Sequence, residues 1–124
     1  KPREFWSMDP SAVIEDGAVI EGPVRIEAGS RIGSGSGVRG PVTIGEGVVV
    51  ENAYVGPYTS LGNGVVIDGG EIEHSIVLDG SKITSRERIV DSILGRNTEV
   101  SSPEDSLPRS GHRLVIGENS KVEL

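Results

Sequence analysis

The sequence predicts an all-β fold, a parallel β-helix of about five triangular coils, and two observations support this prediction. The first is a regular row of aliphatic residues, whereas the second is a composition suited to tight turns. The 124 residues include 18 glycines and 7 prolines, but aromatic residues make up only 3%. The aliphatic residues recur at steps of six and later of five or six, at Ile14, Ile20, Ile26, Ile32, Val38, Ile44, Val50, Val55, Leu61, Ile67, Ile72, Val77, Ile83, Ile89, Leu94 and Val100.

A period of six fits neither an amphipathic helix nor a long two-sided strand. It indicates a short strand followed by a corner, and three such units close one coil of about 18 residues. Glycine often follows the aliphatic residue, as at Gly33 and Gly45, where it supplies backbone freedom for the corner. We expect Ile44 to point inward and Glu46 outward. A second inward row of small or β-branched residues is expected at Ala18, Val24, Ser30, Ser36, Val42, Val48, Thr59, Val65, Ser81 and Thr98.

The pattern divides the chain into three parts. Residues 1–11 are predicted to be a linker or N-terminal cap, residues 12–100 the β-helix, and residues 101–124 a loop and C-terminal capping segment. The loop is predicted from residues 101–111, which are polar and contain two prolines. Ile116 and Val122 keep the spacing of six, so the last segment either covers the end of the β-helix or adds to its faces.

Composition argues against several classes of partner. The net charge of −7 disfavours nucleic acid and anionic membrane surfaces, because both require a basic face. Cysteine is absent, which excludes disulfides and thiolate metal sites and fits a reducing compartment. No apolar run approaches the roughly 18 residues of a membrane span, and no signal-peptide pattern begins the chain. We therefore expect a cytoplasmic protein that binds neither nucleic acid nor membrane.

Gly35–Gly40 matches the GxGxxG pattern of dinucleotide-binding proteins. That reading requires a helix after the glycines. Pro41 and the continuing repeat of six argue against a helix, so these glycines are predicted to be corner residues. No phosphate loop and no nucleophile constellation is present, and no cofactor-binding residue is predicted.

The repeat resembles the hexapeptide-repeat family of β-helices, and this resemblance implies a left-handed coil, although parallel crossovers are ordinarily right-handed. Four segments are also similar to long-form glucose-1-phosphate thymidylyltransferases: Tyr54–Gly62, Glu71–Leu78, Asp91–Asn97 and, most specifically, the ending Arg113–Leu124. The similarity spans roughly residues 12–124.

The resemblance implies a parent enzyme that joins a sugar 1-phosphate to a nucleoside triphosphate and releases pyrophosphate, with dTDP-glucose or a similar nucleotide sugar as product. In that family the chemistry belongs to an N-terminal Rossmann-like domain with a glycine-rich loop and Mg²⁺-binding acidic residues. Neither motif is in these 124 residues. The resemblance therefore implies a non-catalytic β-helix domain that partners its own N-terminal catalytic domain and serves homo-oligomer contacts or regulation.

The alternative is a hexapeptide-repeat acyltransferase that uses acetyl-CoA. Enzymes of this class use a histidine as general base, and His74, beside Glu73, is the candidate here. A solvated or packing role for His74 is the simpler interpretation, and the same holds for His112. The zinc site of γ-class carbonic anhydrases needs three histidines, so no metal site is predicted. A third possibility is a pure assembly module whose exposed Val and Ile faces pair subunits.

Overall fold

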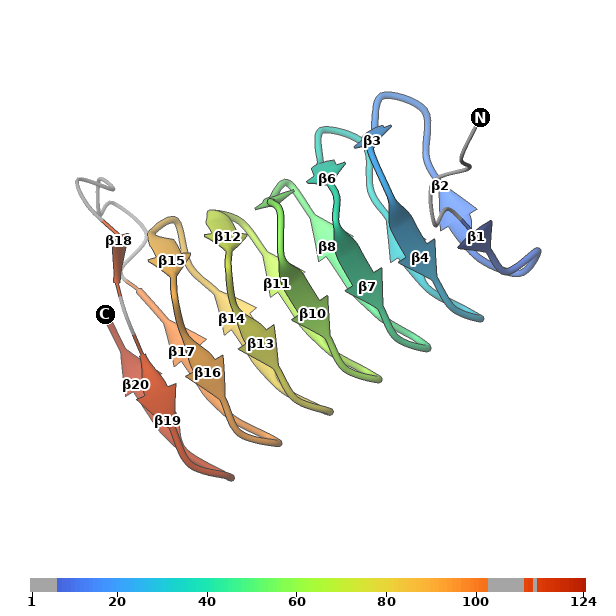
Figure 1. Ribbon diagram of the computed structural model, residues 1–124. Coiled ribbons are helices and arrows are strands. Elements are labelled where there is room, and N and C mark those ends of the chain that lie inside the picture. The colour runs from blue at the N-terminus through green and yellow to red at the C-terminus, as the bar shows by residue number, and fades with distance from the viewer. Residues whose placement is uncertain (1–6, 103–110, 113) are drawn as a thin grey trace.

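The computed structural model describes residues 7–102, 111–112 and 114–124, which form only strands and turns. The chain is a left-handed parallel β-helix, as predicted, and successive coils stack along one axis (Figure 1). Its three faces are parallel sheets of seven, seven and six strands, called sheets A, B and C in the order in which the chain first meets them. None of the described segments forms a helix long and apolar enough to cross a membrane.

Each coil contributes one strand to each sheet. Sheet A contains β1 (Ser7–Met8), β4 (Val24–Ile26), β7 (Val42–Ile44), β10 (Thr59–Leu61), β13 (Ile76–Val77), β16 (Ile93–Leu94) and β19 (Val115–Ile116). Sheet B contains β2 (Val13–Ile14), β5 (Arg31–Ile32), β8 (Val49–Glu51), β11 (Val66–Asp68), β14 (Lys82–Thr84), β17 (Glu99–Ser101) and β20 (Lys121–Glu123). Sheet C contains β3 (Val19–Glu21), β6 (Gly37–Arg39), β9 (Tyr54–Val55), β12 (Glu71–Glu73), β15 (Arg88–Val90) and β18 (Gly111–His112).

The strands make six complete coils and two further strands, more than the five or so coils predicted. One reason is that the coils are not all 18 residues long. Ile26 pairs with Ile44, a step of 18, but Leu61 pairs with Val77, a step of 16. The other reason is that β1 and β18–β20 add strands outside residues 12–100. The sequence left open whether the C-terminal segment covers the end of the β-helix or adds to its faces. In the structure its strands extend all three sheets. Residues 1–6 of the expected N-terminal cap and 103–110 of the expected loop lie outside the described residues.

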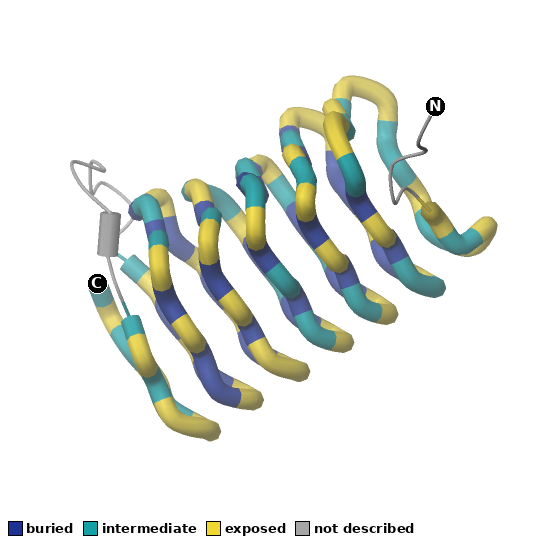
Figure 2. The backbone as a smooth tube through the Cα atoms, in the orientation of Figure 1, coloured by how far each residue is buried: buried dark blue, intermediate teal, exposed yellow. Residues whose placement is uncertain are grey.

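The core is the predicted aliphatic row. Every member from Ile26 to Val100 is buried, whereas Ile14 and Ile20 in the first coil are only half-buried. Figure 2 shows buried residues along the middle coils, whereas the first and last coils are intermediate or exposed. Ile44 is fully buried and Glu46 is exposed, which confirms the predicted register. The second inward row is confirmed too, since all its members are buried except Ala18, which is half-buried.

Five members of the second row are hydroxyl residues. Ser30, Ser36, Ser81 and Thr98 each bond the coil that follows, whereas the buried Oγ1 of Thr59 has no hydrogen-bond partner among the described residues. Ser81 Oγ donates to the carbonyl of Gly95 at 2.8 Å and accepts from the backbone N–H of Thr98 at 3.0 Å. Ser30 makes the same pair of contacts at the same corner three coils earlier, at 2.6 and 2.9 Å. A corner interrupts the strand ladder, so these backbone groups need another partner when they are buried. The buried hydroxyls provide it and connect successive coils.

We predict that Ile44→Asp unfolds the chain, whereas Glu46→Ala has little effect. An aspartate at Ile44 would place a carboxylate in a fully buried aliphatic core, which destabilises the fold by more than about 4 kcal/mol. Glu46→Ala changes an exposed side chain and should stay within about 0.5 kcal/mol. Thermal unfolding followed by circular dichroism measures both variants, and equal melting temperatures would contradict the register.

We predict that Ser81→Ala lowers the free energy of unfolding by about 1–3 kcal/mol, because it leaves a buried carbonyl and a buried N–H without their partner. Ser34→Ala is the matched control, since Ser34 is an exposed serine of another corner. Chemical denaturation of both variants gives the two values. If Ser81→Ala were as stable as Ser34→Ala, the coil-to-coil role of the buried hydroxyls would be wrong.

Candidate functional site

His74, the candidate general base, lies at the corner between β12 and β13, where the chain passes from sheet C to sheet A. Its side chain is exposed. Its backbone N–H donates to the carbonyl of Pro57 at 3.0 Å, and its ring faces the ring of Tyr58 with 5.3 Å between centroids at an interplanar angle of 58°. Tyr58 lies at the same corner of the preceding coil and is 65% exposed. The two rings form a small aromatic pair on the outer edge of the β-helix.

The backbone of this corner is left-handed in the first, third, fourth and fifth coils, whereas in the second coil Gly40 and Pro41 are joined there by a cis peptide bond. The φ angles are +63° at Tyr58, +52° at His74 and +51° at Asp91, and Gly22 has +76° at the same corner of the first coil. Side chains are uncommon in this conformation, especially bulky ones. Because the corner repeats this geometry along the stack, the φ of His74 follows from the turn and is not a special feature of a reactive residue.

Glu73, which precedes His74 in the sequence, contacts a different partner. Its Oε2 lies 3.5 Å from Nη2 of Arg88 in the next coil, and Nε of Arg88 lies 3.6 Å from Oε1 of Glu71. These residues share the outer surface of sheet C. The described contacts therefore give His74 an aromatic neighbour, while Glu73 joins an ion-pair cluster.

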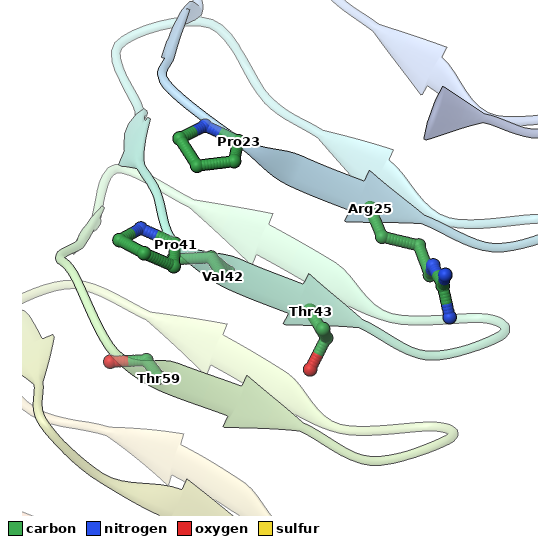
Figure 3. Close-up of a pocket in the computed structure, with 6 residues that line it drawn as sticks. All are labelled: Pro23, Arg25, Pro41, Val42, Thr43 and Thr59. Carbon is green, nitrogen blue, oxygen red and sulfur yellow. The ribbon is translucent and has the colours of Figure 1, made fainter. Parts of the chain in front are cut away.

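Two hollows lie near sheet A, and His74 lines neither. One has a volume of about 380 Å³ and mostly apolar walls (Figure 3); its lining residues are Pro23, Arg25, Pro41, Val42, Thr43 and Thr59. The other, of about 470 Å³, lies toward the A–B corner and shares Arg25 and Thr43 with the first. Acyl transfer needs a donor and an acceptor held at the base. Neither of these two hollows provides such a space at His74.

The remaining candidates from the sequence are the glycine motif Gly35–Gly40, His112 and a possible metal site. Gly35 and Gly40 are corner residues, as predicted, whereas Gly37 is the first residue of strand β6, and β7 follows instead of a helix. A Cβ on Gly40 would meet the carbonyl oxygen of Pro23, so this glycine permits close stacking of two coils. The side chain of His112 lies outside the described residues. Within residues 7–102, 111–112 and 114–124, no three His, Asp or Glu side chains are grouped to hold a metal ion.

Ion pairs on sheet B also join successive coils. Arg31 lies between two carboxylates, with Nη1 at 2.7 Å from Glu15 and Nη2 at 2.6 Å from Glu51. The backbone N–H of Ser34 donates to Glu15 at 3.0 Å. This hydrogen bond, followed by the contact with Arg31, holds the pKa of Glu15 below its ordinary value of 4.5. The groups are largely solvated, so their role is to align neighbouring coils.

The geometry defines a β-helix domain of the hexapeptide-repeat class, and comparisons with known proteins place it more closely. The family model of the GMPPB C-terminal domain matches residues 38–123. This chain therefore belongs to the GMPPB C-terminal domain family.

Curated relatives agree with that assignment. A glucose-1-phosphate thymidylyltransferase from Streptomyces griseus is 38% identical over 112 residues, which cover 90% of this chain and 31% of that protein. The low-salt glycan biosynthesis nucleotidyltransferase Agl11 from Haloferax volcanii is 49% identical over 71 residues, 57% of this chain and 20% of that protein. The chain thus spans about a third of the length of the thymidylyltransferase it matches. The resemblance to the β-helix domain of thymidylyltransferases is confirmed.

Among solved structures, PerB from Caulobacter crescentus, in complex with CoA and GDP-perosamine, superposes with a TM-score of 0.76 at 24% identity. The match covers 92% of this chain and 55% of that one. At this level of identity the likeness concerns the fold alone, which many functions share.

Proposed function

We propose that this chain is the non-catalytic β-helix domain of a sugar-1-phosphate nucleotidyltransferase and that it holds the subunits of that enzyme together. The observation that supports this most is the pattern of coverage. The relatives named for this activity match 90% of this chain but only 31% and 30% of their own length.

The parent enzyme of this proposal joins a sugar 1-phosphate to a nucleoside triphosphate and releases pyrophosphate. An oxygen of the sugar phosphate attacks the α-phosphorus, and the bond from that phosphorus to the pyrophosphate leaving group breaks. Mg²⁺ would bind in the preceding catalytic domain. The product would be dTDP-glucose or a similar nucleotide sugar. Such an enzyme would work in the cytoplasm, and the absence of cysteine is compatible with that compartment.

We predict that the coding sequence upstream of Lys1 encodes a Rossmann-like domain with a glycine-rich loop after its first strand, because the phosphates of the nucleotide need such a loop. The longer protein should release pyrophosphate from a nucleoside triphosphate, a sugar 1-phosphate and Mg²⁺. The 124-residue chain alone should not, under identical conditions. A start codon within a few residues of Lys1 or pyrophosphate release by the isolated chain would contradict the proposal.

The second candidate is an acyltransferase in which His74 deprotonates the acceptor. One observation favours it: His74 is exposed at a corner, where an acceptor could reach the imidazole. Against it, neither hollow near sheet A reaches His74, and Glu73 is engaged with Arg88.

We predict that isothermal titration calorimetry detects no binding of acetyl-CoA to the chain at high micromolar concentration, since neither hollow near sheet A adjoins His74. His74→Ala serves as the control and should give the same trace. Binding by the natural chain that His74→Ala retains, with acyl transfer that His74→Ala loses, would establish the acyltransferase instead.

A further inference from the structure

Sheet A differs from the other two faces in its outward side chains. Along its second half the outward residues Ile76, Ile93 and Val115 stand in register on neighbouring strands. Parallel strands are about 4.8 Å apart, so the three side chains form one continuous row. Their exposed fractions are 44%, 48% and 80%. We call these three residues the apolar row.

Other exposed apolar side chains gather around the same face. Eight large apolar side chains of the described chain are exposed. Besides the apolar row, Met8 belongs to sheet A, while Tyr58 and Leu78 flank its strands β10 and β13. Only Val13 on sheet B and Val19 on sheet C lie elsewhere. Exposed apolar side chains that gather on one face mark an interaction surface, whereas scattered ones do not.

Sheet A is also almost free of charge. Arg25 is the single charged residue in its seven strands, and none is acidic. Sheets B and C both carry outward acidic and basic residues on their strands, among them Glu51, Asp68, Glu71 and Arg88. Depletion of charge is the compositional signal of the core of a protein interface. The depletion of charge and the exposure of apolar side chains therefore both indicate sheet A as the interaction surface.

We propose that sheet A is the surface through which two copies of this chain associate, with the apolar row at the centre of the contact. This inference rests on the proposed function, because it names the face that performs the subunit contact. Each copy carries a net charge of −7, so two copies repel unless their carboxylates are kept apart. Sheet A is the described face that can meet its own equivalent without setting acidic strand residues against each other.

The position of the apolar row favours a second copy over the preceding domain as the occupant. Sheet A runs from β1 at one edge to β19 at the other, and the two lie at opposite ends of the β-helix (Figure 1). A domain that precedes β1 in the chain joins at the β1 end. The apolar row is on β13, β16 and β19, at the far end.

The test is the mass of the 124-residue chain in sedimentation equilibrium, for the natural sequence and for Ile93→Glu. The natural chain is expected at about twice 13.0 kDa, and Ile93→Glu at the monomer mass, because it places two more carboxylates in the contact. Val19→Glu is the matched control. Val19 is an aliphatic residue of similar exposure, 54%, on sheet C, so this variant should remain dimeric.

Val115→Lys provides a second variant on sheet A should Ile93→Glu not fold, and circular dichroism checks folding in each case. Val115 is 80% exposed, so lysine is tolerated there in the monomer, and the dimer is expected to dissociate. A dimer that both sheet A variants leave intact, or that Val19→Glu dissociates, overturns the choice of sheet A but not the proposed function. A natural chain that is monomeric overturns both the pairing of two copies and the subunit contact named in the proposed function. The parent's activity is judged separately, by pyrophosphate release.

Discussion

The structure depends on one constraint: no coil can form the hydrogen bonds of its backbone within itself. Each strand of two or three residues finds its hydrogen-bond partners only on the coils before and after it. Stacking therefore comes first, and it requires equivalent residues to lie directly above one another. The aliphatic row from Ile26 to Val100 is buried because of this alignment. A substitution that disrupts the row in one coil therefore destabilises both neighbouring coils.

The corners carry the second requirement, which is to turn the chain without leaving buried polar groups unpaired. Ser30 and Ser81 meet it with hydroxyls that bond the next coil. In four coils the backbone at the corner between sheets C and A is left-handed, even at Tyr58 and His74, where a side chain disfavours it. The aromatic pair of these two residues is thus placed by the turn. A residue that looks like a candidate base in the sequence is, in the structure, one step of a repeated corner.

In this domain the inner surface is fully occupied by packing that stabilises the fold, and the outer surface is left for contacts with other molecules. Two faces bear charged ladders that align coils, such as Arg31 between Glu15 and Glu51. The third is uncharged apart from Arg25 and carries the apolar row. A β-helix of this kind can present one flat face to a partner because all its strands on that face are parallel and in register, which suits an assembly domain attached to an enzyme.

The repeat of six by itself determined the fold class, the inward register of Ile44 and the second row of small residues, because each depends only on local spacing. The segments similar to thymidylyltransferases determined the family. Up to Val100 the row also gave the coil lengths, because every third member stacks, as Ile26, Ile44 and Leu61 do. The sequence did not reveal that Ile76, Ile93 and Val115 form one exposed row, or that Glu73 contacts Arg88 and not His74. Spacing along the chain fixes which residues stack. It does not fix how exposed an outward side chain is or which neighbour a long charged side chain reaches, and the tertiary structure decides both.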